Sequence, residues 1–221
     1  MAKRPVGGQK IEAYIRKGLM CGRMPLVFCL MGVLTITGCA STEVTSFTDP
    51  KYQGDAYDNF VVWTNDMSLD YGTQLAASIC ENLESKGISC VPRTELFPPT
   101  RDWNPPEVQE RLQARNITGF LEVSRSAQAA DSVYLGSQTR TTVTTSGNTA
   151  QASSQSVPMR MPQRQETLHV RLIDVQTREE AWIGGAQTSG QGMANVTDSA
   201  FISSAAQDIV DSLESDGHIR P

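Results

Sequence analysis

Apolar and polar positions repeat with recognisable periods along most of the chain, and these periods predict its elements. Residues 59–64 are a β-rich apolar run and predict a strand. Apolar residues at helical spacing over about 70–83, with Gly87 as the stop signal, predict a helix. A second strand is predicted over 88–97, bent or close to a sheet edge at Pro92.

Helix-capping and strand signals recur in the middle of the chain. Asn104 precedes two prolines and stands three residues before Glu107, which is the pattern of a capping box. A short helix is therefore predicted from about Pro105 to Asn116. Residues 117–123 then alternate between apolar and polar, which predicts a third strand.

The next segment is polar and of low complexity. From Ser137 to Ser156, 14 of 20 residues are Ser, Thr or Gln. Such a composition buries too little apolar surface to offset the entropy lost on ordering. We therefore expect an exposed, mobile insertion at about 131–165, with an extended hairpin arm over Thr139–Thr145 as the alternative.

A hairpin and a helix are predicted after the insertion. Residues 168–172 and 181–183 are strand-like and flank a polar turn at 174–180. The last helix has Asn195 as its expected N-cap and an apolar stripe over 202–213.

The predicted order is β-α-β-α-β-(insertion)-β-β-α. Because each helix has one apolar stripe, the economical architecture is a mixed sheet of about five strands with about three helices packed on it, an α/β (α+β) fold. A single domain is expected over residues 59–217. The sequence has no internal repeats, which excludes solenoids and propellers.

The N-terminal region has the pattern of a secretory signal. Residues 26–36 are an apolar core that follows a basic segment. The Ile-Thr-Gly-Cys sequence at 36–39 resembles the lipobox of bacterial lipoproteins. In that family the cysteine receives a diacylglycerol, the chain is cut before it, and the new amine is acylated. The resemblance implies a signal peptide over 1–38, lipidation of Cys39 and a lipidated tether over 39–58.

Cleavage is therefore expected after Gly38, with two alternatives open. A permanent transmembrane helix would need about 20 apolar residues, and Cys39 could instead stand beside an ordinary cleavage site. Met20 or Met24 would give a signal of more usual length, so the true start codon is also open. Ala40, and not Asp, follows the cysteine, which by resemblance to enteric lipoproteins implies the periplasmic face of the outer membrane.

The chain from Cys39 onward is acidic. Its 13 Lys and Arg against 23 Asp and Glu give a net charge of −10, which offers no electrostatic footprint for nucleic acid. Anionic lipid would repel it, so membrane contact is expected through the lipid on Cys39. Cys80 and Cys90 lie on either side of the turn at Gly87, and an oxidising periplasm permits them to pair. Two buried free thiols are the alternative.

The predicted hairpin carries a second resemblance. From Leu168 to Trp182 it contains L-H-V-R-L-I-D and then T-x-E-x-A-W. It resembles a group of Gram-negative envelope lipoproteins that includes the activator of penicillin-binding proteins, the TolB N-terminal domain and the curli secretion lipoprotein, and it is closest to uncharacterised members. Over most of 59–216 the resemblance implies a fold similar to anticodon-binding domains, acting through protein contacts and not catalysis. This chain differs from the curli secretion lipoprotein in having one long polar insertion.

Few residues could carry catalysis or bind a metal. His169 is expected on the outward face of its strand and His218 at a frayed C-terminus, and these are the only histidines, so no metal site and no cofactor are expected. The sequence has no G-x-S-x-G elbow and no phosphate-binding glycine loop. Trp103, between two Pro-Pro pairs, is the aromatic residue expected to contact a partner, unless it covers the edge of the core.

These observations favour a non-enzymatic outer-membrane lipoprotein that faces the periplasm and binds or assembles envelope proteins. An oligomeric component of a secretion or envelope complex, similar to the curli secretion lipoprotein, is the alternative. An envelope hydrolase built around His169 is a third, weaker hypothesis.

Overall fold

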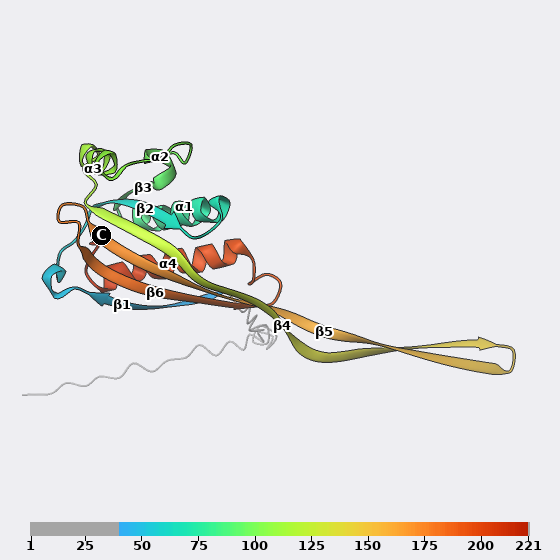
Figure 1. Cartoon of the computed structure of the whole chain (residues 1–221). Helices are drawn as coiled ribbons and strands as arrows, with labels where there is room; N and C mark the ends of the chain where they lie inside the picture. Colours follow the sequence, from blue (N-terminus) through green and yellow to red (C-terminus); the bar gives the residue numbers. More distant parts are fainter. Residues whose placement is uncertain (1–39, 221) are drawn as a thin grey trace, which may run out of the picture. The chain divides into compact units, whose positions relative to one another are not determined.

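A mixed six-stranded sheet with helices against both faces is the framework of the protein (Figure 1). The computed structural model describes residues 40–220. The elements follow one another as β1 (Ser41–Thr48), η1 (Pro50–Tyr52), β2 (Asn59–Asn65), α1 (Leu69–Ser85), β3 (Ser89–Pro92), α2 (Arg93–Leu96), α3 (Pro105–Ala114), β4 (Gly119–Ser146), β5 (Thr149–Asp174), β6 (Glu180–Gln191) and α4 (Asp198–Ser215). The strand order in the sheet is β1-β6-β5-β4-β2-β3. Strand β2 pairs in parallel with β3 and β4, and the other pairs are antiparallel. This is the α/β (α+β) class that was predicted.

The predicted signal peptide, the cleavage after Gly38 and the lipidation of Cys39 lie outside the described residues. They stay predictions. Among the described residues, no helix has both the length and the apolar character that crossing a membrane requires.

Local signals define the ends of the predicted helices. Ser68 caps α1 by accepting a hydrogen bond from the backbone of the first turn. Asn104 and Glu107 form the predicted capping box at the start of α3. For α4 the cap is Thr197 and not the predicted Asn195. The cap position was wrong by two residues because both side chains suit an N-cap and only the loop geometry selects one of them.

Two hydrophobic clusters on opposite faces of the sheet hold the layers together. The larger lies under α1 and α4, where Leu75, Ile79 and Leu83 of α1 and Ile209 and Leu213 of α4 are fully buried. The smaller lies on the other face, under α2 and α3; its buried members are Val61, Leu96, Phe97, Leu112, Ile117 and Val175. Strand β2 is covered on both faces, which explains its continuous apolar run.

The tether predicted over 39–58 is corrected by the structure, because Ser41–Thr48 is an edge strand paired with β6. The period-2 pattern of this strand is hidden because three of its four inward positions carry hydroxyls and only Val44 is apolar. Thr42 Oγ1 lies 2.8 Å from Ser204 Oγ, and Ser46 donates to Asp216 at 2.6 Å, both on or just after α4. The hydrogen bonds allow polar side chains to face the helix layer.

Two further boundaries differ from the prediction. The strand predicted over 88–97 ends at Pro92, and residues 93–96 form the short helix α2. The polar insertion at 131–165 is not a loop between strands. Its residues extend β4 and β5 as a paired hairpin, the arrangement that had been the alternative expectation.

Candidate functional site

Strands β4 and β5 continue well beyond the sheet as a two-stranded hairpin (Figure 1). The last pair that β5 makes with β6 is Gln163 with Gln191. From there to the turn, residues 132–162 form a ladder with each other, and we call this segment the arm. At its base the Pro162 carbonyl also accepts from the Gly192 backbone N–H at 2.9 Å. The first strand of the arm has 15 residues and spans roughly 50 Å at about 3.3 Å per residue. An arm of this length presents both faces and both edges to its surroundings.

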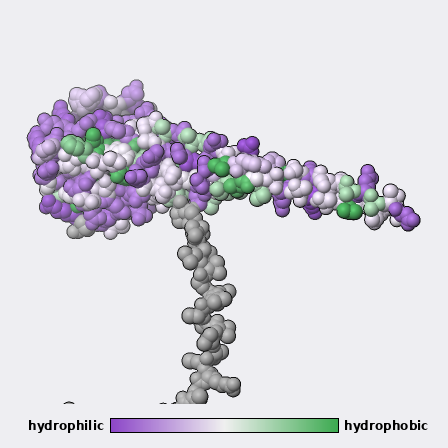
Figure 2. Space-filling view, turned by 90° about the horizontal axis from the view of Figure 1, so that it is seen from below, coloured by the Kyte–Doolittle hydropathy of each residue, from purple (hydrophilic) through white to green (hydrophobic). Residues whose placement is uncertain are grey.

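An apolar patch lies on the part of the arm nearer the sheet. Its members are the exposed side chains of Val133, Tyr134, Leu135, Val157 and Met159. Figure 2 shows apolar side chains gathered part-way along the arm, between polar stretches. The β4 register shifts between Tyr134 and Gly136, so Leu135 is left without a cross-strand partner, as in a β-bulge. An exposed apolar group of this kind is typical of a contact surface.

The free edge of β5 has fewer backbone donors where the patch lies. Pro158 and Pro162 both fall within the ladder with β4, and proline is tolerated in a strand where its nitrogen faces away from the neighbour. The nitrogen of Pro158 therefore faces the open edge, where it removes one N–H group. At Pro162 the same edge is covered, because the Gly192 backbone N–H donates to the Pro162 carbonyl at 2.9 Å. This disfavours the addition of another strand there. A partner would therefore contact the side chains of the arm more readily than its backbone edge.

The outer half of the arm is polar and ends in a tight turn. Cross-strand hydroxyl contacts join Thr141 to Ser154 at 3.1 Å and Thr139 to Ser156 at 3.4 Å. Gly147 begins the two-residue turn with φ of +60°, a conformation that glycine adopts at little cost. A hairpin with two polar faces specifies its own register weakly. The register of the arm therefore depends on its root.

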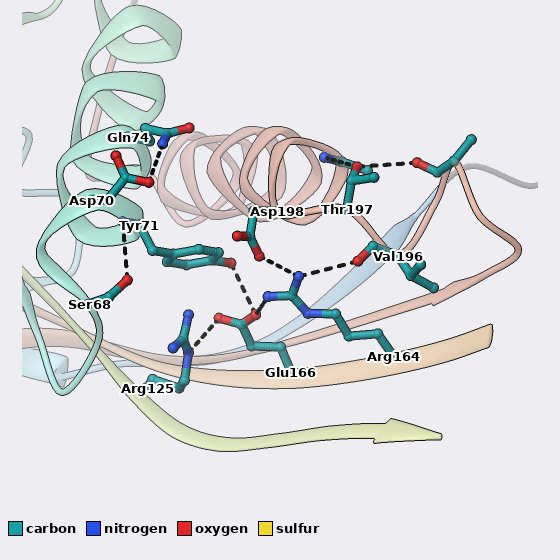
Figure 3. A network of polar contacts seen from close by, with 12 residues as sticks. Ser68, Asp70, Tyr71, Gln74, Arg125, Arg164, Glu166, Val196, Thr197 and Asp198 are labelled. Carbon is teal, nitrogen blue, oxygen red and sulfur yellow. Dashed lines mark hydrogen bonds and ion pairs between the residues drawn. The ribbon is translucent and has the colours of Figure 1, made fainter. Parts of the chain in front are cut away.

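A buried network of charges lies at the root of the arm (Figure 3). The side chain of Glu166 is 1% exposed. Its Oε1 accepts from Arg125 Nε at 2.9 Å, and its Oε2 accepts from Arg164 Nη2 at 2.8 Å and from the Tyr71 hydroxyl at 3.0 Å. Arg164 Nη1 also donates to Asp198 Oδ1 at 2.5 Å. Four elements meet here: β4 and β5 supply the arginines and the glutamate, α1 the tyrosine and α4 the aspartate.

Aromatic rings complete the surroundings of the two arginines. The guanidinium of Arg125 lies 4.3 Å from the centre of the Tyr71 ring, and that of Arg164 lies 4.4 Å from the centre of the Phe201 ring. Burial, followed by the charge of Glu166, raises the pKa of Tyr71. Burial alone would lower the pKa of Arg164, but hydrogen bonds to Asp198 and Glu166 raise it overall. The tyrosine therefore stays a hydrogen-bond donor and the arginine stays charged.

This network is better suited to positioning than to maximal stability. Apolar residues of similar volume often stabilise a core as well as a buried ion pair does, and the Nε of Arg164 is buried without a hydrogen-bond partner. Glu166 fixes two arginines on neighbouring strands and a tyrosine on a helix. It therefore determines how β4 and β5 leave the sheet.

Sequence reasoning did not find the arginines and the glutamate of this network. A signal was present, because Arg164 and Glu166 continue the same face of β5 as the buried Leu168, Val170 and Leu172. Opposite charges two residues apart on a core-facing strand indicate a buried ion pair. Arg164 falls within the insertion predicted at about 131–165, whose low complexity hides this signal.

Cys80 and Cys90 lie together in the structure. Cys80 is on α1 and Cys90 on β3, both are buried, and a disulfide joins them with a Cα–Cα distance of 5.1 Å. The distance lies within the usual range for disulfides. Oxidation of this pair in the cell stays a prediction.

Trp103 packs against the smaller hydrophobic cluster. Its ring meets Phe97 edge-on at 5.4 Å, and its indole N–H donates to the Pro98 carbonyl at 3.1 Å. The guanidinium groups of Arg101 and Arg111 lie over the ring at 3.6 and 4.4 Å. These contacts cover the edge of the core, which was the alternative to a partner contact. A contact with a partner stays a prediction.

The two histidines lie in different environments. His169 is exposed on the outward face of β5, as predicted. His218 is fully buried, and its ring contacts Thr48 Oγ1 at 3.0 Å and the Asp55 carbonyl at 3.2 Å. The expected frayed C-terminus is therefore wrong, because these bonds tie it to the strand edge. The described residues contain no cluster of His, Cys, Asp and Glu suited to a metal ion.

Comparisons with known proteins do not assign this chain to a family. No protein-family model matches the sequence, and no curated protein matches it at a significant level. The PelC dodecamer from Paraburkholderia phytofirmans is a similar solved structure, with 14% identity, a TM-score of 0.46, and 81% of this chain and 99% of that chain covered. Lipoprotein GNA1162 from Neisseria meningitidis is similar over 71% of this chain and 98% of that chain, with 13% identity and a TM-score of 0.39. These values are too low to assign a function.

Proposed function

We propose that this protein is a lipid-anchored outer-membrane lipoprotein that faces the periplasm and binds or assembles envelope proteins without catalysing a reaction. The observation that carries the proposal is the arm, whose root is fixed by the Glu166 network and whose surface exposes an apolar patch. The lipobox sequence at 36–39 supplies the expected attachment to the membrane.

The arm suits contact with a macromolecule better than chemistry on a small one. Residues 132–162 are paired as two strands, whereas a small-molecule site is concave. Its charged residues are Arg140 and Arg160, and neither is accompanied by an acidic residue of the arm. An exposed apolar patch with flanking cations and hydroxyls fits a protein surface that is itself partly apolar and acidic.

Photo-crosslinking tests the arm as the contact surface. A photoreactive amino acid at Tyr134 or Met159 should capture a discrete envelope protein in the source bacterium. The matched control is the same substitution at Thr141, which lies in the polar outer half of the arm. The substitution pair Y134S/L135S should abolish capture at Met159 and leave the unfolding midpoint in urea unchanged, because both side chains are exposed. Equal capture at all three positions would count against the patch.

Membrane attachment is tested separately. The intact mass of the purified chain should correspond to a triacylated protein that begins at Cys39, and inhibition of signal peptidase II should leave the precursor. The variant Cys39→Ser should lose the lipid and fractionate away from the membrane. A chain without acyl groups in the untreated cells would contradict this part of the proposal.

An assembly of several copies is the second candidate function, favoured by the distribution of charge. The arm has a net charge of +2 and the remainder of residues 40–221 has −12. The arm of one copy would therefore be attracted to the body of another. Mass measurement in detergent tests this: oligomers that dissociate in R140E/R160E support it, and a monomer at all concentrations contradicts it.

A hydrolase built around His169 gains no support from the described residues. The imidazole is exposed on β5, and within residues 40–220 its side chain has no hydrogen bond to a nucleophile or carboxylate. That the protein catalyses no reaction is a part of the proposal to be tested. A panel of envelope-type ester and amide substrates, assayed with H169A as the control, should give no histidine-dependent turnover.

A further inference from the structure

A cavity of about 260 Å³ lies where β2 ends and α1 begins. Its walls come from the end of β2, the first turns of α1 and the segment that contains α2. From β2 and β3 the chain crosses over opposite faces of the sheet, through α1 on one face and through α2 and α3 on the other. In α/β sheets, ligands bind at such points, outside the carboxyl ends of parallel strands.

Arg93 is the cation in the wall of this cavity. Its guanidinium stacks on the Trp63 ring at 3.6 Å. Its hydrogen-bond partner in the described chain is the side-chain oxygen of Asn65, at a long 3.5 Å. No carboxylate within residues 40–220 lies at ion-pair distance from it. Burial lowers the pKa of Arg93 without an opposing carboxylate to raise it. The guanidinium is thus partly desolvated and has no counter-ion from the described residues.

The other walls set the size and character of a ligand. The hydroxyl-bearing residues Thr64, Ser68 and Thr94 line the cavity together with the apolar residues Met67 and Phe97. The volume lies below the range of pockets for drug-sized molecules. The ligand should therefore be small, with an apolar part beside its polar end.

The charged residues of the cavity wall indicate the charge of the ligand. Asp66 also lines the cavity, is exposed, and lies beyond ion-pair distance from Arg93. One guanidinium near one carboxylate favours a singly charged anion over a doubly charged one. The planar fork of arginine matches the two oxygens of a carboxylate.

We infer that this cavity binds the carboxylate of a small amphipathic ligand, either a free organic acid or the C-terminus of a short peptide, with Arg93 as the anion partner. This inference is independent of the lipid anchor and of the arm. It is carried by a guanidinium at the wall of a built cavity that has no counter-ion among residues 40–220.

Nuclear magnetic resonance of the mature chain in detergent tests the site directly. The indole N–H of Trp63 donates to Asn65 Oδ1 at 3.0 Å and reports from beside the cavity. Titration with N-acetyl-Ala-Ala should shift this resonance saturably, and the C-terminal amide of the same peptide should bind at least about tenfold more weakly, since hydrogen bonds to charged groups are the strong ones. Titration with acetate distinguishes the two sources of the carboxylate. If acetate and N-acetyl-Ala-Ala bind with equal affinity, the ligand is a free acid; if the peptide binds more tightly, the ligand is a peptide C-terminus.

The variants supply the controls. R93Q should weaken binding of the free-acid peptide by about tenfold or more, and R93K should weaken it less because it keeps the charge without the fork. R101Q is the matched control, because Arg101 stacks on Trp103 at the same 3.6 Å but lies outside the cavity lining. Unchanged spectra elsewhere verify that R93Q folds. The inference is overturned if acid and amide bind equally, if R93Q binds as the parent does, if phosphate binds more tightly than the carboxylates, or if no acid shifts the Trp63 resonance.

Discussion

Substitution of Glu166 by glutamine should destabilise the protein strongly while changing almost no atoms. The amide keeps the size of the carboxylate and one oxygen for the Tyr71 hydroxyl, but it removes the negative charge. Arg164, whose side chain is 8% exposed, and Arg125, at 17%, would then lose their buried counter-charge. Asp198 cannot replace it, since its side chain is largely exposed and its ion pair within residues 40–220 is with Arg164 alone. Breaking a buried pair of this kind costs about 3–5 kcal/mol.

Urea unfolding followed by circular dichroism measures this cost. An exposed ion pair gives the matched comparison: Lys51 and Glu179 are in contact, and both side chains are more than half exposed. K51A should change the unfolding free energy by at most about 1 kcal/mol. E166Q should also raise the rate of amide hydrogen exchange in residues 132–162, because the root no longer fixes their register. If E166Q costs no more than K51A, the network does not hold the arm and the reasoning is refuted.

Three other predictions concern the domain itself. C80A/C90A should lower the unfolding free energy by about 3 kcal/mol through the lost loop closure, and an unchanged midpoint after reduction of the parent would show that the thiols are not paired. Gly190→Ala should destabilise the protein by about 1–3 kcal/mol or more, because its Cβ would lie 2.1 Å from a backbone oxygen. Gly185→Ala serves as the control, since its Cβ meets open space. Equal effects of the two substitutions would contradict the steric argument. Burial lowers the pKa of His218 below its ordinary 6.5, so the unfolded chain binds the proton more readily and the unfolding free energy should fall as the pH drops below about 6.5. H218Q should show a shallower fall than the parent, and parallel pH profiles would rule this contribution out.

Elements with a complete local signal were predicted from the sequence. The capping box of Asn104 and Glu107 identified the start of α3, and the helical spacing up to Leu83 identified α1. Such signals depend on residues within one or two turns of each other. The Cα atoms of Cys80 and Cys90 are 5.1 Å apart for the same reason, since a short turn joins their helix and strand.

Elements whose pattern depends on distant partners were missed. Three of the four inward positions of β1 carry hydroxyls. Thr42 and Ser46 suit a partly buried face because α4 and the residue that follows it supply hydrogen-bond partners. Arg164 lies within the polar insertion predicted at about 131–165 and Glu166 directly follows it. Both are buried because Tyr71 and Asp198 arrive from two other elements. Neither partner is near in the sequence.

The sequence by itself determined the class of fold, the order of most elements and the expectation of a lipid attachment at Cys39, because period, capping and the lipobox are all local patterns. Only the tertiary structure decided that the polar insertion is a paired arm and that its root is a buried ion network. A polar hairpin gains too little from its own side chains to define its register. The charges at its base acquire that role only when strands and helices from distant parts of the chain surround them.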